Sequence, residues 1–562
     1  MRVQYGLAFY FLDQRNFFHF IMTTSIGTFD YIIIGGGTAG CVLANRLSAN
    51  PEIKVLMLEA GGKDNYLWIH IPVGYLYCIG NPRTDWCFKT EPEPGLNGRT
   101  IAYPRGRVLG GSSSINGMIY MRGQTRDFEQ WKAQGNPGWG WEDVLPYYMR
   151  SEDYHRGADE MHHTGGEWRI EKQRLSWEIL DAFREAAAEV GIPKVVDFNR
   201  GNNEGCGYFE VNQKRGIRWN AAKGFLRPAL KRPNLTVLTH AVVKRLRVEG
   251  KRVTGVEFWR DNELLQADAT LEALLAAGAV GSPQILQCSG LGPADLLQQH
   301  GIAVVHDLPG VGENLQDHLQ LRMTFRVKNT RTLNETAGSL LGKLGMGLQY
   351  LLLQRGPLSM SPSQLGAFAR SDASRSMPNL EYHVQPLSLD KFGEPLHSFP
   401  AFTASVCNLN PESRGHIRIN SADSRVAPRI QPNYLSTEAD RKVAVDSLRL
   451  TRRIVAAAAL KRHTPEECKP GPALQTDEEL IKAAGDIGTT IFHPVGTCKM
   501  GDDHKADPLS VVDARLRAHG VTGLRVVDAS IMPTITSGNT CSPVVMFAEK
   551  ASAMIIEDRK GV

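Results

Sequence analysis

The chain has 562 residues, of which 42% are hydrophobic and 22% charged, and its mean hydropathy is −0.26. This size and balance exclude a small disulfide-stapled scaffold, a disordered chain and an integral membrane bundle. The 64 lysines and arginines against 59 aspartates and glutamates leave a net charge of only +5, without a long basic run, so we expect no nucleic-acid partner.

Cysteine and glycine usage narrow the class further. The nine cysteines are odd in number, widely spaced and contain no Cys-x-x-Cys pair, so we predict reduced thiols in a cytoplasmic protein. Peripheral attachment to the inner membrane is the alternative location. The 55 glycines exceed average usage and lack the period of collagen, which indicates many points where the backbone approaches something closely.

The first 28 residues are predicted to form an extension outside the folded domains. Two aromatic-rich pieces, residues 7–12 and 17–21, are separated by four polar residues, and neither is long enough for a membrane span. The polar break also argues against a secretory signal. Whether translation begins at Met1 or at Met22 is left open.

A strand, a glycine-rich turn and a helix come next. Residues 29–34 form a nearly continuous apolar run, typical of a strand covered on both faces, and residues 41–48 repeat apolar positions at helical spacing. A second strand is predicted over residues 55–58 and ends at Glu59. The order is therefore β-α-β, with Gly-x-Gly-x-x-Gly at the first turn.

This β-α-β unit predicts a dinucleotide site. Gly35 permits the tight turn, Gly37 lets the backbone approach a pyrophosphate, and Gly40 lets helix and strand pack closely. The helix N-terminus attracts the negative charge, and Glu59 is placed to accept hydrogen bonds from both ribose hydroxyls. A glutamate at that position disfavours NADP, but NAD and FAD both remain open.

A second glycine cluster, Gly106-Arg-Val-Leu-Gly-Gly-Ser-Ser-Ser-Ile-Asn-Gly117, follows in the same region. A plain NAD domain has no need of such a loop, and Pro104 and Arg107 stiffen and charge its entrance. Here the sequence resembles the glucose-methanol-choline (GMC) oxidoreductase family, whose first signature lies in this stretch. The further matching segments, in family order, are residues 278–292, 308–318, 493–500, 524–533 and 537–540.

The resemblance runs from about residue 29 to 557 and implies FAD as the cofactor. It implies an α/β fold in which a Rossmann-like FAD-binding domain is assembled from residues 29–150, 205–320 and 485–562. An α+β substrate-binding cap built on an antiparallel sheet would comprise residues 151–204 and 321–484. The expected cofactor-binding residues are Gly35, Gly37, Thr38, Ala39, Gly40, Glu59, Ala60, Arg107, Gly110, Gly111, Ser112, Asn116, Gly117, Met118, Ile119, Val243, Ala277, Asp528, Ala529, Asn539 and Thr540.

Several elements of the two domains are predicted from pattern. Residues 235–248 and 253–258 indicate a β-hairpin of the FAD-binding domain, and residues 380–384, 401–406 and 416–419 the strands of the cap. Over residues 340–353 apolar side chains recur on one helical face, which favours a core or dimer contact over a membrane anchor. A homo-oligomer and peripheral membrane contact are both retained as alternatives.

Within the family pattern, His493 is the expected general base. Oxidising an alcohol requires removal of the hydroxyl proton, and a neutral imidazole has a pKa near working pH. Asn539 stands where many members have a second histidine, and its NH₂ group can hydrogen-bond the substrate oxygen. This His and Asn combination resembles the choline and aliphatic-alcohol branches.

The C-terminal helix and Asp528 are expected to serve the cofactor. Residues 544–556 show helical periodicity, with Pro543 in the first turn, and in this family the positive end of that helix points toward the flavin pyrimidine ring. Asp528 is expected to contact the ribityl or pyrophosphate region through side chain and backbone.

Further residues bear on how FAD is attached, on metal binding and on the substrate cavity. Some family members attach FAD covalently through a histidine after the Ser-Ser of the first signature, and Ser114 stands there, so we predict dissociable FAD. His162 and His163 are interpreted as part of a surface loop, not a metal site, and no metal is expected. Trp86, Glu381 and Tyr382 are candidates for a cage near the cavity.

The predicted function is FAD-dependent oxidation of a primary alcohol to the aldehyde, with electrons passed to a quinone or another non-NAD acceptor. The alternatives are an alcohol oxidase that reduces O₂ to hydrogen peroxide, a hydroxynitrile lyase, and a flavin-bound protein without catalysis.

Overall fold

A computed structural model describes residues 24–390 and 394–560. Both N-terminal aromatic pieces and Met22 lie outside the described residues. Strand β1 (Thr24–Ile34) begins earlier than predicted and pairs with β11 (Glu263–Leu275) from Thr24 onward. The expectation that residues 24–28 belong to a separate extension is therefore wrong, because their backbone is part of the sheet.

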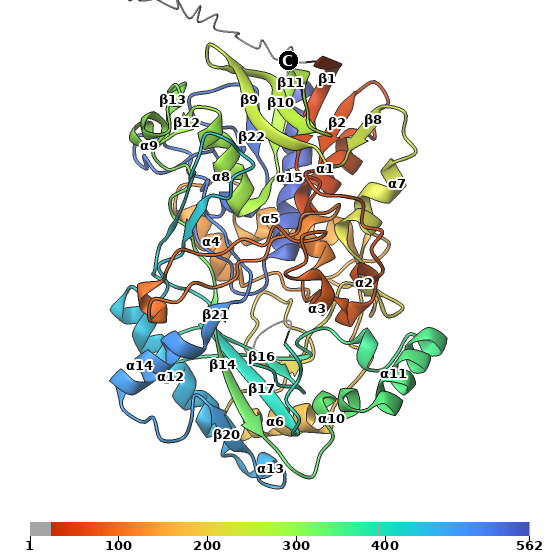
Figure 1. Ribbon diagram of the computed structural model, residues 1–562, viewed down its shortest axis with the longest axis vertical. Coiled ribbons are helices and arrows are strands. Elements are labelled where there is room, and N and C mark those ends of the chain that lie inside the picture. Colours follow the sequence, from red (N-terminus) through yellow and green to blue (C-terminus); the bar gives the residue numbers. More distant parts are fainter. Residues whose placement is uncertain (1–23, 391–393, 561–562) are drawn as a thin grey trace, which may run out of the picture.

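The upper half of the molecule in Figure 1 is built on a seven-stranded sheet of order β8-β2-β1-β11-β10-β9, in which β22 also pairs with β11. Strand β2 (Val55–Leu58) is wholly buried and parallel to β1, as its continuous apolar run predicts. Helix α1 (Thr38–Leu47) and helix α15 (Cys541–Lys560) pack against each other in the core of this half. The remaining strands are β8 (Leu235–Leu238), β9 (Val242–Glu249), β10 (Arg252–Arg260) and β22 (Leu524–Val526).

The predicted hairpin is only partly right. Strands β9 and β10 form it, whereas β8 pairs in parallel with β2 at the other side of the sheet. The chain turns sharply between β8 and β9 at His240, whose φ is +58°. A single apolar run therefore covers two strands that end at opposite edges.

The lower half is built on an antiparallel sheet of order β20-β14-β17-β16-β15-β5, with β21 pairing β14. One face carries leucine, phenylalanine and valine side chains that pack on helices α6 (Glu178–Glu189) and α12 (Glu438–Val455). The other face carries polar side chains and is turned to the first domain. The strands are β5 (Gly205–Tyr208), β14 (Leu319–Arg326), β15 (Leu365–Ala369), β16 (Leu380–Gln385), β17 (Ala401–Asn408), β20 (Glu466–Lys469) and β21 (Gly488–Thr490).

The domain boundaries differ from the predicted ones in three places. Strands β5 and β21 belong to the cap sheet although their residues were expected in the FAD-binding domain. Strands β3 (Glu152–Tyr154) and β4 (Trp168–Ile170) bury Tyr154, Trp168 and Ile170 in the core of the upper half. Strand β18 (His416–Arg418) pairs only with β19 (Arg429–Gln431), outside the cap sheet. Short polar segments gave no sign of which sheet they would join.

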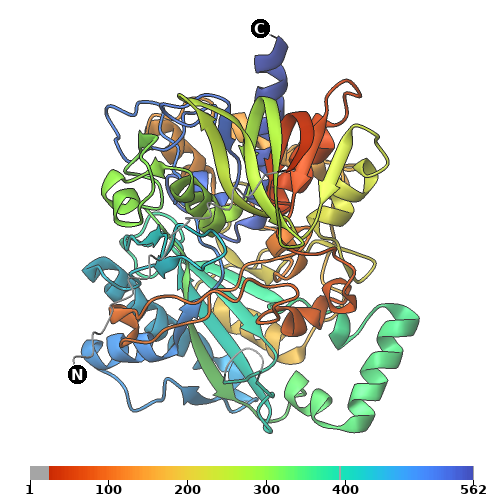
Figure 2. The same ribbon diagram turned by 45° about the horizontal axis from the view of Figure 1, so that its top comes forward.

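The other elements connect and cover the two sheets. Figure 2 shows α11 standing out at the lower right, away from both sheets. The helices are α2 (Leu67–His70), α3 (Tyr75–Cys78), α4 (Thr125–Ala133), α5 (Trp141–Ser151), α7 (Arg227–Ala229), α8 (Gly278–Cys288), α9 (Ala294–Gln299), α10 (Leu333–Gly338), α11 (Leu340–Leu353), α13 (Ala458–Lys461) and α14 (Asp477–Ile487). The short turns are η1 (Pro72–Gly74), η2 (Pro94–Leu96), η3 (Gly111–Ser114), η4 (Ala222–Leu226), η5 (Pro357–Ser359) and η6 (Ala529–Ile531), and the short strands β6 (Gln213–Lys214), β7 (Ile217–Arg218), β12 (Leu291–Gly292) and β13 (His306–Asp307).

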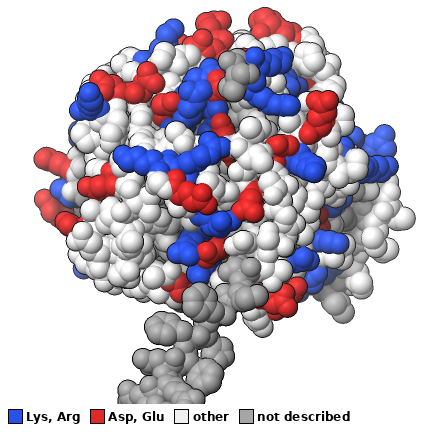
Figure 3. Space-filling view, turned by 90° about the horizontal axis from the view of Figure 1, so that it is seen from above, with Lys and Arg blue, Asp and Glu red and all other residues white. Residues whose placement is uncertain are grey.

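Surface charge is mixed on the face seen in Figure 3, where lysines and arginines alternate with aspartates and glutamates. Within the described residues, none of the helices combines the length and the apolar character needed to cross a bilayer.

Candidate active site

A long cavity lies where the two sheets face each other. Its walls come from β1 and the start of α1, from the second glycine-rich loop, from the start of α15, and from the polar face of the cap sheet. Segments more than 500 residues apart in sequence therefore meet around one space. Of the predicted cofactor-binding residues, those that line it are Gly35, Gly37, Thr38, Ala39, Glu59, Ala60, Gly111, Ser112, Asn116, Gly117, Met118, Ile119, Val243, Ala277, Asp528, Ala529, Asn539 and Thr540.

Three predicted residues, Gly40, Gly110 and Arg107, do not line the cavity. A Cβ on Gly40 would lie 1.9 Å from the carbonyl oxygen of Gly35, so this glycine serves helix-strand packing. Gly110 has φ +86° and donates its N–H to the Gly36 carbonyl at 2.8 Å, which brings the two glycine loops together. The Arg107 guanidinium lies over the Trp86 ring, 4.9 Å from its centroid. Direct contact of these three residues with a cofactor stays a prediction.

Glu59 holds one end of the cavity. Its two carboxylate oxygens accept the N–H groups of Gly36 at 2.8 Å and Gly61 at 2.7 Å. Burial raises the pKa of Glu59, while these two N–H groups and the Arg107 charge act in the opposite direction. Each carboxylate oxygen keeps a further lone pair, so the hydroxyls of a bound ribose could still donate to it.

Asp528 lines the cavity, but its carboxylate is used within the protein. It accepts hydrogen bonds from Gly278 N–H at 2.9 Å, the Ser282 hydroxyl at 2.5 Å and Ser530 N–H at 2.8 Å. Burial raises the pKa of Asp528, although these donors lower it. The Asp528 side chain therefore connects the end of β22 to the start of α8. Only the backbone beside Asp528 remains available to a cofactor.

The start of α15 faces the same space. Asn539, Thr540 and Cys541 line the cavity just before and at the first turn, so the positive end of a 20-residue helix points into it. The helix begins three residues earlier than the periodicity predicted. Asn539 Nδ2 lies 3.0 Å from His493 Nε2, which brings together the two residues predicted to carry the chemistry.

The tautomer of His493 follows from its neighbour His318. His318 Nε2 lies 3.1 Å from the carbonyl oxygen of Leu409, which only accepts, so Nε2 carries the proton. The free lone pair on His318 Nδ1 then faces His493 Nδ1 at 3.0 Å and accepts its proton. His493 Nε2 is left as the basic nitrogen, beside Asn539.

The backbone around His493 is held just as closely. Asp317 accepts the His493 N–H at 2.8 Å through one oxygen, and the hydroxyls of Tyr434 at 2.5 Å and Thr490 at 2.6 Å through the other. Phe492 has φ +72°, a strained value for a bulky side chain, and its carbonyl accepts a hydrogen bond from Arg105 at 2.6 Å. Surrounding contacts thus fix the imidazole in an otherwise unfavourable turn.

Burial keeps His493 uncharged. Desolvation lowers its pKa well below the ordinary 6.5, and the nearby His318, His383 and Arg105 lower it further. Burial lowers the pKa of His318 as well. The pair is therefore neutral near pH 7, as the tautomer assignment requires.

The cap sheet supplies the wall opposite these residues. Gln320 of β14 and His383 and Gln385 of β16 line the cavity. Glu381 lies two residues before His383 and 3.2 Å from its Nε2, but it does not line the cavity. Among the candidate cage residues, Trp86 lines the cavity. Tyr382 lies on the opposite face of β16, in a hydrophobic core, and does not line the cavity.

Sequence reasoning missed Arg105, Asp317, His318 and His383. Asp317 and His318 stand in a segment that matches the family, so that match was a signal, but nothing local assigned them to His493, 175 residues away. His383 is one of 16 histidines, in a strand whose alternation is ordinary. Only strand pairing brings it to the cavity.

Among the described residues, one trio could in geometry hold a metal ion: His318, Glu381 and Cys407. Both ring nitrogens of His318 are occupied by His493 and Leu409. His318 therefore has no nitrogen left for a metal ion while these two contacts hold.

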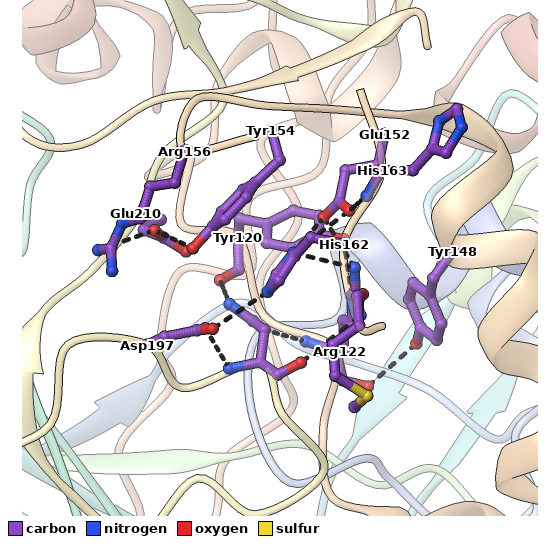
Figure 4. Close-up of polar contacts among 12 residues, drawn as sticks. Tyr120, Arg122, Tyr148, Glu152, Tyr154, Arg156, His162, His163, Asp197 and Glu210 are labelled. Atoms are coloured by element: carbon purple, nitrogen blue, oxygen red, sulfur yellow. Dashed lines mark hydrogen bonds and ion pairs between the residues drawn. The ribbon is translucent and has the colours of Figure 1, made fainter. Parts of the chain in front are cut away.

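The interpretation of His162 and His163 as a surface loop is wrong for His162. Its side chain is fully buried, with Nδ1 3.1 Å from Glu152 and Nε2 3.1 Å from Asp197 (Figure 4). Because both neighbours are carboxylates, both nitrogens donate, and the pKa of His162 is raised to about 9 by these hydrogen bonds against the opposing effect of burial. Arg122 donates to the same Glu152 at 2.8 Å. The carboxylates come from positions 10 and 35 residues away, beyond the reach of spacing rules.

The cavity fits a flavin dinucleotide. A Cβ on Gly111 would lie 2.7 Å from the Gly37 Cα, so the two glycine loops form a wall that only bare backbone allows. The buried Asn539 Oδ1 has no hydrogen-bond partner among the described residues, and a donor on a bound ligand would satisfy it. Ser114, at the covalent-attachment position of some family members, donates to the Leu109 carbonyl at 2.8 Å and accepts from Asn220 at 2.8 Å, away from the cavity.

Comparisons with known proteins agree with this arrangement. The GMC oxidoreductase N-terminal family profile matches residues 29–320, and the C-terminal profile matches residues 411–548. The chain is 41% identical over 534 residues to an oxygen-dependent choline dehydrogenase of Photobacterium profundum (94% of this chain and 93% of that protein), and 40% identical over 532 residues to an alcohol dehydrogenase [acceptor] of Pseudomonas putida (94% and 96%). The crystal structure of pyridoxine 4-oxidase from Mesorbium loti superposes with a TM-score of 0.85 at 32% identity, covering 94% of this chain and 99% of that one.

Proposed function

The chain belongs to the GMC oxidoreductase family and has its fold, and on that premise we propose that it oxidises a neutral primary alcohol to the aldehyde, with non-covalently bound FAD, and passes the electrons to a quinone or another non-NAD carrier. The single observation that carries the proposal is the basic Nε2 of His493, fixed by His318 and placed 3.0 Å from Asn539.

Bound FAD would supply the acceptor for the hydride. His493 Nε2 accepts the hydroxyl proton of the alcohol, because it is the unprotonated nitrogen and burial keeps it neutral. Asn539 Nδ2 donates to the oxygen as negative charge develops there. The N-terminus of α15 adds partial positive charge at the same end of the cavity.

A neutral alcohol is favoured over a quaternary ammonium such as choline by the polar face of the cap sheet. The cavity-lining residues from that sheet, Gln320, His383 and Gln385, are not carboxylates, and the Glu381 carboxylate, 3.2 Å from His383 Nε2, does not line the cavity. A quaternary ammonium is best held by a carboxylate together with an aromatic cage. Tyr75, Trp86 and Phe88 line the cavity, so the preference rests on the lack of a carboxylate on the cap face.

Anaerobic mixing of the FAD-loaded enzyme with a panel of alcohols tests the reaction and its substrate class. We expect flavin bleaching by aliphatic or aromatic primary alcohols and little by choline. Bleaching by choline alone would refute the preference for neutral alcohols, and no bleaching by any alcohol would refute the oxidation itself. Measuring peroxide per alcohol consumed in air distinguishes a carrier-linked dehydrogenase from an oxidase, since only the oxidase gives a ratio near one.

Two further measurements address the base and the cofactor linkage. His493→Ala should slow flavin reduction by roughly 10² to 10⁴ while FAD stays bound, and an unchanged rate would remove His493 from its role. Acid precipitation should release FAD into the supernatant, since Ser114 offers no nucleophile to the cavity. Yellow colour retained by the precipitate would contradict non-covalent binding.

A further inference from the structure

Helix α11 turns its apolar side chains to the solvent. Leu341, Leu344, Leu348, Leu351 and Leu352 recur at helical spacing on one face and are between 57% and 82% exposed. The opposite face packs inward through Met346 and Tyr350. The sequence-based expectation of a core contact is therefore wrong for the leucine face, and Figures 1 and 2 both show the helix projecting from the cap domain.

Specific contacts hold this helix in place. Its N-cap, Ser339, accepts the Gly342 N–H at 2.9 Å, and the Tyr350 hydroxyl donates to the Gly216 carbonyl at 3.0 Å. Arg174 donates to the Gln354 carbonyl at 3.0 Å, just past the last turn. The leucine face is thus a fixed part of the folded surface.

The charges around α11 have one predominant sign. Lys343 within the helix and Arg331 and Arg355 at its flanks are exposed, and so are Lys214 and Arg215 of the hairpin on which its C-terminal end rests. Residues 326–356 contain a single acidic residue, Glu335, whose carboxylate accepts the Thr332 N–H. An apolar stripe bordered by cations is typical of a helix that lies on a negatively charged membrane surface.

We propose that α11 docks the protein on a bilayer containing anionic lipid, with its leucines in the hydrocarbon boundary and its basic flanks against the headgroups. At 14 residues the helix is about 21 Å long, shorter than the roughly 30 Å hydrocarbon core of a bilayer. The helix therefore lies along the interface and does not span it.

A second copy of the chain fits this face less well. In a symmetric dimer the same surface packs on itself, so the basic flanks of one copy would face basic side chains of the other, with Glu335 the single acidic residue of residues 326–356. A bilayer with anionic lipid instead supplies the opposite charge.

Helix α11 is also connected to the wall of the cavity. Helix α11 contacts η5, the chain then continues to Pro362 and Ser363, which line the cavity, and η5 packs on η1, next to the cavity-lining Tyr75. If the proposed function holds, docking would bring this wall of the cavity close to the bilayer, in which apolar alcohols and lipid-soluble electron acceptors dissolve. Docking itself is independent of that function, because it depends only on α11.

Flotation of the FAD-loaded enzyme with vesicles tests the docking. With equal parts of phosphatidylcholine and phosphatidylglycerol we expect the wild type to float, and to float less at high salt or on pure phosphatidylcholine. Leu344→Glu/Leu348→Glu should lower the partition coefficient at least about tenfold. The control Leu230→Glu/Leu509→Glu makes the same charge change on exposed leucines elsewhere and should float as the wild type does.

Both variants should keep FAD and turn over alcohol with a soluble dye acceptor at the wild-type rate. If the leucine variant fails to fold, Lys343→Gln/Arg355→Gln tests the proposal with the apolar face intact, and it should lose the preference for anionic vesicles. Wild-type protein that stays unbound, or a leucine variant that floats unchanged, would overturn the proposal. So would light scattering that shows a wild-type dimer which the leucine variant converts to a monomer.

Discussion

Replacing His318 by alanine tests whether the tautomer of His493 is set by its neighbour. The wild-type geometry places His318 Nδ1 3.0 Å from His493 Nδ1, and both side chains are buried. Without His318, the proton on His493 Nδ1 loses its acceptor. The competing tautomer, with the proton on Nε2, can no longer accept a proton from the substrate.

The size of the effect follows from the lost hydrogen bond. Leaving a buried donor unpaired costs about 1 to 3 kcal/mol, which at about 1.4 kcal/mol per tenfold corresponds to a roughly 5- to 150-fold slower flavin reduction. Since His318 acts through His493 and does not face the proposed FAD site, FAD content should not change.

Anaerobic stopped-flow bleaching of the flavin by a good alcohol substrate measures this rate. His318→Gln should recover much of it, because an amide oxygen can accept the His493 Nδ1 proton. His463→Ala, which removes another fully buried histidine outside the cavity, is the matched control and should reduce at the wild-type rate. A wild-type rate in His318→Ala, or equal losses in His318→Ala and His318→Gln, would refute the reasoning.

Three further outcomes are expected. Glu59→Ala should lose FAD on gel filtration, because it removes hydrogen-bond acceptors at the far end of the cavity. When the variant is saturated with FAD, its flavin should still be reduced by alcohol at the wild-type rate. Normal retention of FAD would contradict the ribose role of Glu59. Because the pKa of His493 lies well below 6.5 and its neutral form is the base, kcat/KM should fall with acid only well below pH 6.5, and a limb at or above 6.5 would show a charged, solvated histidine instead. His162 has a pKa of about 9 in the fold against 6.5 when unfolded, so its ion pairs stabilise the fold fully below pH 6.5 and are lost as the pH rises through 9. The thermal midpoint of the wild type should therefore fall between pH 6.5 and 9, whereas that of His162→Gln should be lower and change less with pH. Parallel curves for the two proteins would contradict the pairing.

Residues whose role is local were predictable from sequence. The apolar runs of β1 and β2, the glycines between them and Glu59 lie within 36 residues, and close backbone approach there requires glycine whatever the rest of the chain does. His493 and Asn539 were identified through resemblance to a family, because 46 residues separate them and no spacing rule links them.

Short strands were the least predictable elements. β5 has four residues and β18 has three. Side-chain alternation over so few residues does not indicate which sheet a strand will join. For the leucine face of α11 only the core alternative is wrong, since periodicity shows that a helix has an apolar face but not whether protein covers that face.

The sequence by itself determined the β-α-β unit, the family and the two residues proposed to carry the chemistry, because these depend on residue type over short stretches or on whole-chain similarity. The tertiary structure alone decided what fixes His493, which histidine is buried as a cation, and which apolar face is left open. Those properties depend on burial and on partners brought from distant segments, such as His318 for His493 and Asp197 for His162, and no local pattern encodes them.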